Sequence, residues 1–255
     1  MVEVQRGAGC CFLFCQTCKA ILRAAKGDTA AATTVRCFTI PDCVPQLSLE
    51  EEKQLIQDDL EIAADLLLTN NKHDAHLLGI QSLAHLSKVT KCRAFAAQCI
   101  LGGDFLPTLL SLVESYRMDR NCNNDNTTET LSVMEEEHFF FMHRHALAVL
   151  SNCLTALEAS GELQHVLEQN EELCSVALLT SLVNEMAHAS ERPHEACYAV
   201  QCINSMVRSS TAVKQAACEL GAIQALDSAY REGVCRHANL ATFASKLQSD
   251  IAGDN

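Results

Sequence analysis

Apolar residues recur at steps of three and four positions through most of the chain, which is the spacing that places them on one side of an α-helix. The first such run follows Leu47, where Ser48 and Glu51 have the spacing of a capping box and predict a helix start. Similar runs follow at 76–88, 91–101, 104–116 and from 138 onward. The pattern therefore predicts a mainly helical chain.

Polar and glycine-containing breaks separate these runs. Gly102-Gly103 is expected to end the helix before it, because glycine tolerates a left-handed cap. Residues 117–137 hold an Asn/Asp/Thr run and three consecutive glutamates, and are expected to be a loop or disordered. We therefore expect a Cys-rich, weakly structured segment over 1–46, a helical domain over 47–251 with a polar insert at 117–137, and a tail over 252–255.

Three of the helical segments are similar to one another. They carry GIQSLAHLS from Gly79, ALAVLSNCL from Ala146 and AVQCINSM from Ala199. After the third comes ELGAIQAL, with Gly221 at its turn, and after the first comes a looser match around Gly103. A fixed period of this kind indicates stacked structural units.

These segments resemble armadillo (ARM/HEAT-like) repeats, whose units run helix, short helix, glycine and helix over about 40–47 residues. The second segment departs from that pattern, because Asn170 stands where the family has glycine. The resemblance implies an all-α, armadillo-type right-handed α-solenoid of about three full repeats plus partial capping repeats. It also implies that Gly103 and Gly221 form structural repeat junctions.

The resemblance further implies a concave groove that binds a partner segment through one polar residue on each long helix. These positions are His85, Asn152 and Ser205. Ala148 stands where peptide-binding members often carry Trp, and the chain has no Trp. Binding of nuclear-import cargo is therefore not expected from the resemblance.

Charge and cysteine content narrow the function classes. The net charge is -13, which excludes binding to nucleic acid through a basic face and favours a basic or extended peptide segment of another protein. The chain has fifteen cysteines, an odd number that would leave one thiol unpaired in a secreted protein. Nine of them lie outside the N-terminal segment, mostly within helical patterns, where a reduced cysteine acts as a small hydrophobic residue. The cysteine content therefore indicates a reducing compartment. No apolar run approaches the ~20 residues that cross a bilayer. We expect a cytoplasmic protein, with a nuclear location and organelle targeting by residues 1–43 left open.

Catalytic motifs are absent from the sequence: there is no nucleotide-binding loop, no Gly-x-Ser-x-Gly and no His-Glu-x-x-His. We therefore expect no enzyme, no cofactor and no metal. One zinc alternative combines Cys15 and Cys18 with Cys37 and Cys43, although the second pair is spaced loosely and no glycines flank either pair. The leading interpretation is a protein-protein interaction scaffold or adaptor. The alternative is an N-terminally targeted or lipid-anchored adaptor at a membrane or organelle, which meets a membrane only if the N-terminal Cys10-Cys11 is acylated.

Overall fold

The computed structural model describes residues 48–68, 73–89, 92–115 and 133–253, and their regular structure is entirely helical. This confirms the all-α prediction for the described part of the chain. The chain forms two compact units, 1–96 and 97–255. The expected repeat domain, 47–251, is thus divided between the two units.

The described part of the first unit contains helices α3 (Leu49–Leu67) and α4 (His73–Val89), which pack against each other. The predicted capping box is confirmed at the start of α3. The Glu51 amide donates to Ser48 Oγ at 3.3 Å, and the Ser48 amide donates to Glu51 Oε2 at 2.8 Å. The apolar side of α3 is buried, as the three- and four-residue spacing predicts; its buried apolar residues are Ile56, Leu60, Ala63 and Leu66.

Helices α5 (Arg93–Leu101) and α6 (Phe105–Ser115) meet at Gly102-Gly103, the predicted break. The left-handed cap predicted there is wrong, because the positive-φ glycines of the described chain lie elsewhere. A Cβ on Gly102 would come within 2.8 Å of the Gln98 carbonyl oxygen, and one on Gly103 within 2.7 Å of the Cys99 carbonyl oxygen. The turn therefore requires glycine for close approach, and not for its left-handed conformation.

Helix α8 (Val133–Ser160) starts earlier than the sequence predicts. Its first five residues belong to the stretch 117–137 that was expected to be a loop. Glutamate is a good helix former, so the three glutamates at 135–137 extend the helix. The rest of the expected insert lies outside the described residues.

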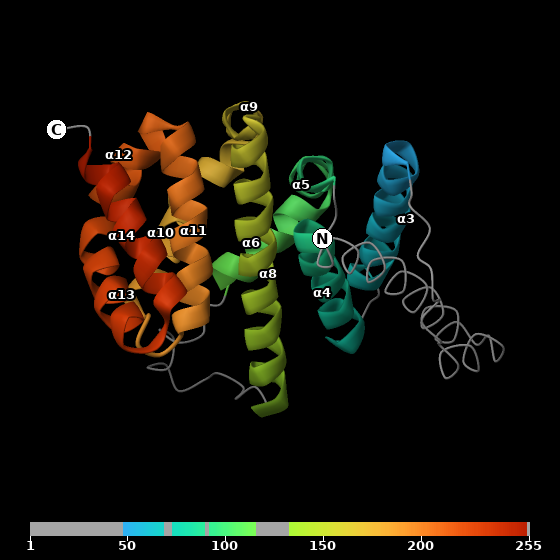
Figure 1. The fold of residues 1–255 in the computed structure, drawn as a ribbon. Helices are drawn as coiled ribbons and strands as arrows, with labels where there is room; N and C mark the ends of the chain where they lie inside the picture. The colour runs from blue at the N-terminus through green and yellow to red at the C-terminus, as the bar shows by residue number, and fades with distance from the viewer. Residues whose placement is uncertain (1–47, 69–72, 90–91, 116–132, 254–255) are drawn as a thin grey trace, which may run out of the picture. The chain divides into compact units, whose positions relative to one another are not determined.

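The long helices of the second unit form two layers (Figure 1). One consists of α8, α11 (Pro193–Ser209) and α14 (Ala238–Ala252), in which α11 packs against both neighbours. The other consists of α6, α10 (Val176–Ala187) and α13 (Ala222–Arg236). The chain alternates between the layers and uses short connectors, namely α9 (Leu163–Gln169), the 3-10 helix η1 (Glu171–Cys174) and α12 (Thr211–Glu219).

Local signals explain where these helices begin. Ser175 and Ser210 are N-caps whose hydroxyls accept from the third following amide, at 3.2 and 3.3 Å. Gly221 has φ of 86° and starts α13, so glycine is required at this predicted junction. Asn170 does not take a left-handed conformation, since its φ is -124°, and η1 follows it directly. Gly161, with φ of 76°, separates α8 from α9 and was not predicted.

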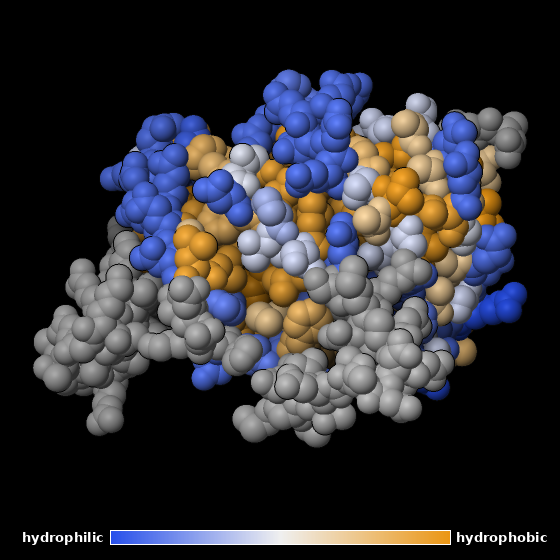
Figure 2. All heavy atoms as spheres, turned by 180° about the vertical axis from the view of Figure 1, so that it is seen from behind, coloured by the Kyte–Doolittle hydropathy of each residue, from blue (hydrophilic) through white to orange (hydrophobic). Residues whose placement is uncertain are grey.

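Helix α11 is the most enclosed element of the second unit. Eleven of its seventeen residues are buried, because it has neighbours on both sides and α10 beneath it. Small buried residues, including Cys202 on α11 and Cys153 on α8, let these helices lie close together. Hydrophobic residues also reach the surface between hydrophilic ones on one face of the molecule (Figure 2), and seven large hydrophobic side chains are exposed among the described residues.

Candidate functional site

The helices α8 and α11 are joined by a row of polar contacts. On α8 the contacting residues are seven positions apart, which is two helical turns, so their side chains leave the same side of the helix. The pairs are Arg144 Nε to Glu195 Oε1 at 2.5 Å, Ser151 Oγ to Gln201 Oε1 at 2.6 Å, and Ser205 Oγ to Glu158 Oε2 at 2.7 Å. Residue numbers rise together on both helices, so α8 and α11 are parallel.

Polar contacts also join α11 to α14. At one end, Nε2 of His237 lies 3.2 Å from Nδ1 of His194. The other ring nitrogen of His237, Nδ1, accepts a hydrogen bond from the Leu240 amide and so caps the start of α14. At the other end, Arg208 bonds Asp250 of α14 at 2.7 Å and Glu158 of α8 at 2.8 Å. The hydrogen bond to Glu158, followed by the smaller effect of the hydrogen bond to Asp250, raises the pKa of Arg208. We call the three parallel helices α8, α11 and α14 the parallel layer.

A second, more deeply buried polar group ties the parallel layer to the layer behind it. Glu185 of α10 forms an ion pair with Arg192, in which Glu185 Oε1 lies 3.0 Å from Arg192 Nη1. The same oxygen lies 3.5 Å from Nε2 of His143, which is fully buried. Nδ1 of His143 lies 3.1 Å from the carbonyl oxygen of Leu112 in α6. Removing one member of such a buried pair is costly, so this group has a structural role.

One end of the parallel layer carries an aromatic cluster, which we define as Phe140, Phe141, Arg144 and Tyr198. The Arg144 guanidinium lies 5.3 Å from the centre of the Phe140 ring, and the Phe140 and Phe141 rings pack edge to face at 5.9 Å. Phe141 is exposed and Tyr198 is half-buried. Burial raises the pKa of Tyr198, which also interacts electrostatically with Arg144 and Glu195. Aromatic residues and arginine are enriched at protein interfaces.

The predicted groove residues have different surroundings. Asn152 is half-buried, and it lies on the side of α8 that also carries the exposed Phe141, Thr155 and Ala159. Ser205, on the neighbouring helix, is only 2% exposed, and its hydroxyl donates a hydrogen bond to Glu158. As placed, Ser205 holds two helices together and does not face a partner.

His85 belongs to α4 in the first unit, so the three predicted residues do not share one unit. It is half-buried, and burial lowers its pKa. Sequence reasoning missed Arg144, Glu195 and Tyr198. The available signal was Glu195, the one glutamate of α11, among buried positions that are mostly apolar.

The buried thiols of the second unit are poorly suited to reaction. Burial raises the pKa of Cys153 and of Cys202, and it raises the pKa of Cys197 to about 11. A thiol reacts as the thiolate, so these groups are held in their unreactive form. Among the described residues, no three His, Cys, Asp or Glu side chains could hold a metal ion together. The zinc alternative of Cys15, Cys18, Cys37 and Cys43, together with Cys10-Cys11, lies outside the described residues.

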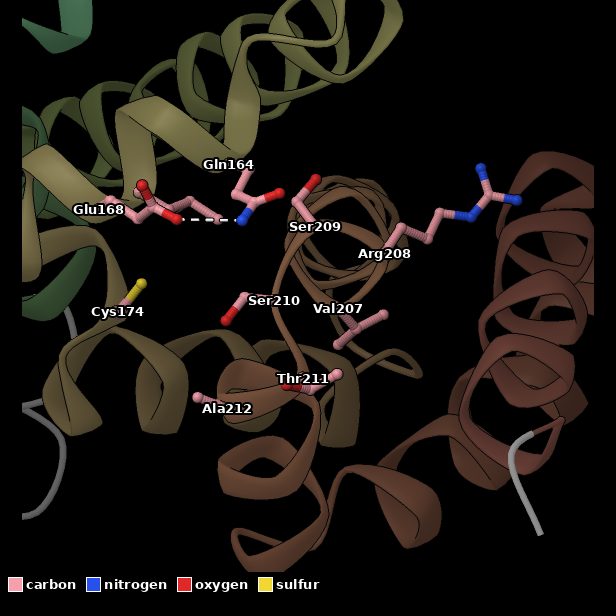
Figure 3. A pocket seen from close by; sticks show the side chains of 10 residues that line it. Gln164, Glu168, Cys174, Val207, Arg208, Ser209, Ser210, Thr211 and Ala212 are labelled. Atoms are coloured by element: carbon pink, nitrogen blue, oxygen red, sulfur yellow. Dashed lines mark hydrogen bonds between the residues drawn. The ribbon is translucent and has the colours of Figure 1, made fainter.

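An open pocket of about 400 Å³ lies where α9 and η1 meet the start of α12 (Figure 3). Its lining includes Cys174, whose pKa is raised by burial, and Gln164 donates to Glu168 across one wall at 3.0 Å. The hydroxyl of Ser210 is already used as the N-cap of α12, and the Arg208 guanidinium points away from the cavity toward α14. The pocket therefore offers neither a free cation nor a reactive thiol to a ligand.

No single helix in the described ranges is long and apolar enough to cross a membrane; α5 and α6 together have suitable length and composition, but they are bent by 78°. A comparison of the sequence with protein-family models and with curated proteins finds no match.

Proposed function

We propose that this protein is an interaction scaffold whose second unit binds a segment of another protein on the exposed side of the parallel layer. The observation that supports this proposal is the combination of partly exposed aromatic and polar side chains on one side of α8 and α11. These are the aromatic cluster and Asn152, and they lie in a layer whose other polar groups bond to one another. Such a surface is rigid before it binds, which lowers the entropic cost of association.

We further propose that the two layers correspond to stacked armadillo-like repeats. The order of short helix, helix and helix recurs along the second unit, ending with α12, α13 and α14. The left-handed Gly221 at the start of α13 agrees with the junction that this family uses. In this arrangement, α8, α11 and α14 are the third helices, which line the groove in the family.

The proposed partner is an extended segment that bears lysine or arginine. Arg144, the cation of the aromatic cluster, is already paired with Glu195. Glu137 is exposed on α8 about one turn before Phe141, and the whole chain carries a net charge of -13. Binding should therefore weaken as salt is raised, because exposed charges are screened.

The test is affinity capture of the full chain followed by quantitative mass spectrometry. The face variant combines Asn152→Ala with Tyr198→Ala. The matched control combines His165→Ala with Gln169→Ala, which changes two exposed polar residues of α9. The proposal expects partners that the face variant loses and the control keeps, with both variants melting at the temperature of the wild type.

Two results would count against this function. One is a partner set that is the same for all three proteins. The other is a partner whose binding does not change between low and high salt. That result would contradict the proposal that the partner segment is basic, and it would not affect the proposed location of the binding face.

A further inference from the structure

Helix α13 presents an apolar stripe to solvent, away from the parallel layer's aromatic cluster. Ile223, Tyr230 and Val234 are 47%, 41% and 63% exposed, and they account for three of the seven exposed large hydrophobic residues in the described chain. Their spacing of seven and four residues places them on one side of the helix. The buried side of α13 is formed by other residues, namely Ala222, Ala225, Leu226, Ala229 and Gly233.

Two opposite charges accompany this stripe. Asp227 and Arg231 are both exposed and follow the stripe along the helix. Asp227 accepts a hydrogen bond from Gln248 of α14 at 2.8 Å, and no ion pair joins it to Arg231 in the structure as described. Both charges are therefore available to a neighbouring molecule.

The order of the apolar and charged residues along α13 allows the helix to pair with a second, antiparallel copy of itself. When two copies of α13 are packed antiparallel about a point between Ser228 and Ala229, Ile223 of each copy lies opposite Val234 of the other. In the same register, Asp227 of each copy lies opposite Tyr230 and Arg231 of the other. Apolar side chains thus meet apolar side chains, and each carboxylate meets a phenol and a guanidinium. A twofold interface requires this kind of self-complementarity, because one patch serves both partners.

We propose that α13 is a self-association surface through which two copies of this chain pair by antiparallel packing of their α13 helices. In Figure 1, α13 lies at the end of the second unit opposite to α8, so this surface is separate from the aromatic cluster of the proposed partner-binding face. A single pair of helices buries less than the roughly 1,200 Å² of a standard interface. The dimer is therefore weak and concentration-dependent, with a dissociation constant in or above the micromolar range.

The first experiment measures the mass of the full chain by sedimentation over a wide concentration series. The wild type should rise from the 27.8 kDa monomer toward twice that mass. A variant combining Ile223→Ser with Val234→Ser should remain monomeric at every concentration. The matched control is Val176→Ser, which removes a valine that is 65% exposed on α10, and it should associate as the wild type does.

The second experiment tests the register by charge reversal. Asp227→Arg gives each copy two positive groups at the contact, and Arg231→Asp gives each copy two negative groups. Each variant alone should associate about tenfold or more weakly than the wild type. An equimolar mixture should recover the dimer, because every contact then joins opposite charges.

Three results would overturn the proposal. They are a wild type that stays monomeric throughout the series, a reversal variant that associates as strongly as the wild type, and a mixture that gains nothing over its components. The first result would leave the stripe to a different protein as its occupant. Thermal melting of each variant establishes that the loss of the Asp227–Gln248 contact has not unfolded the chain.

Discussion

The pairing of Arg144 with Glu195 sets a measurable part of the stability of the second unit. Glu195 is 0% exposed, and its Oε1 lies 2.5 Å from Arg144 Nε. Its other oxygen, Oε2, has no hydrogen-bond partner among the described residues. The change Arg144→Met keeps most of the side-chain volume and removes the charge, so the buried carboxylate loses the cation that compensates it.

Removing one partner of a buried ion pair costs about 3–5 kcal/mol. The Arg144 side chain is 31% exposed, so water partly screens the pair and the cost is reduced. We expect Arg144→Met to lower the free energy of unfolding by about 2–3 kcal/mol. The double variant Arg144→Met with Glu195→Met buries no charge, and it should recover most of that loss.

Urea unfolding followed by tyrosine fluorescence is a suitable assay, since the three tyrosines all lie in the second unit and the chain has no tryptophan. Arg236→Met is the control, because Arg236 is 68% exposed and its ion pair within the described part of the chain is with Glu232 on its own helix. The control should cost less than about 0.5 kcal/mol. The reasoning is refuted if Arg144→Met costs no more than the control, or if the double variant is as unstable as the single one.

Four further outcomes follow from the structure. A Cβ at Gly233 would lie 2.5 Å from a backbone nitrogen of α14, so Gly233→Ala should destabilise the second unit by about 1–3 kcal/mol in the same urea assay. Ser48→Ala removes the hydroxyl that caps α3, so amides in the first turn of α3 should exchange faster with deuterium while those of α8 stay unchanged. In native protein, iodoacetamide should label the exposed Cys235 and spare Cys153 and Cys202, and mass spectrometry should show that only unfolding makes the two buried thiols reactive. Burial raises the pKa of these two thiols above the value of 9 that they have in the unfolded chain. Their contribution to the free energy of unfolding is therefore fully present below pH 9, and it should decrease as the pH rises beyond 9.

Local features of the fold could be predicted from the sequence. The capping box of Ser48 and Glu51 depends on a few neighbouring residues and is present, and Gly221 starts α13 at the turn where the sequence pattern places a glycine. The break at Gly102-Gly103 was placed correctly for the wrong reason. Sequence shows that glycine is needed at a turn, but it does not show whether a positive φ or a close carbonyl oxygen requires it.

The candidate site was less predictable, because its contacts join distant parts of the chain. Ser205 was expected to face a partner, yet its hydroxyl donates a hydrogen bond to Glu158, 47 positions earlier. Arg144 and Glu195 are 51 positions apart, and neither residue has a local pattern that indicates the other. The spacing of an individual helix defines its apolar side, but only the packing of two helices shows which polar residues bond to each other.

The position of Arg208 has an electrostatic consequence for the parallel layer. Each α-helix has a partial negative charge at its carboxyl end, and parallel neighbours bring these ends together. Glu158, Arg208 and Asp250 all lie in the last turns of α8, α11 and α14. Two carboxylates there add to three negative helix ends, and Arg208 bonds both of them. A neutral residue at 208 would remove the guanidinium that bonds both carboxylates, and Lys214, which donates to the Asp250 carbonyl oxygen at 3.0 Å, reaches the end of α14. Arg208 is therefore the group that links the ends of all three helices.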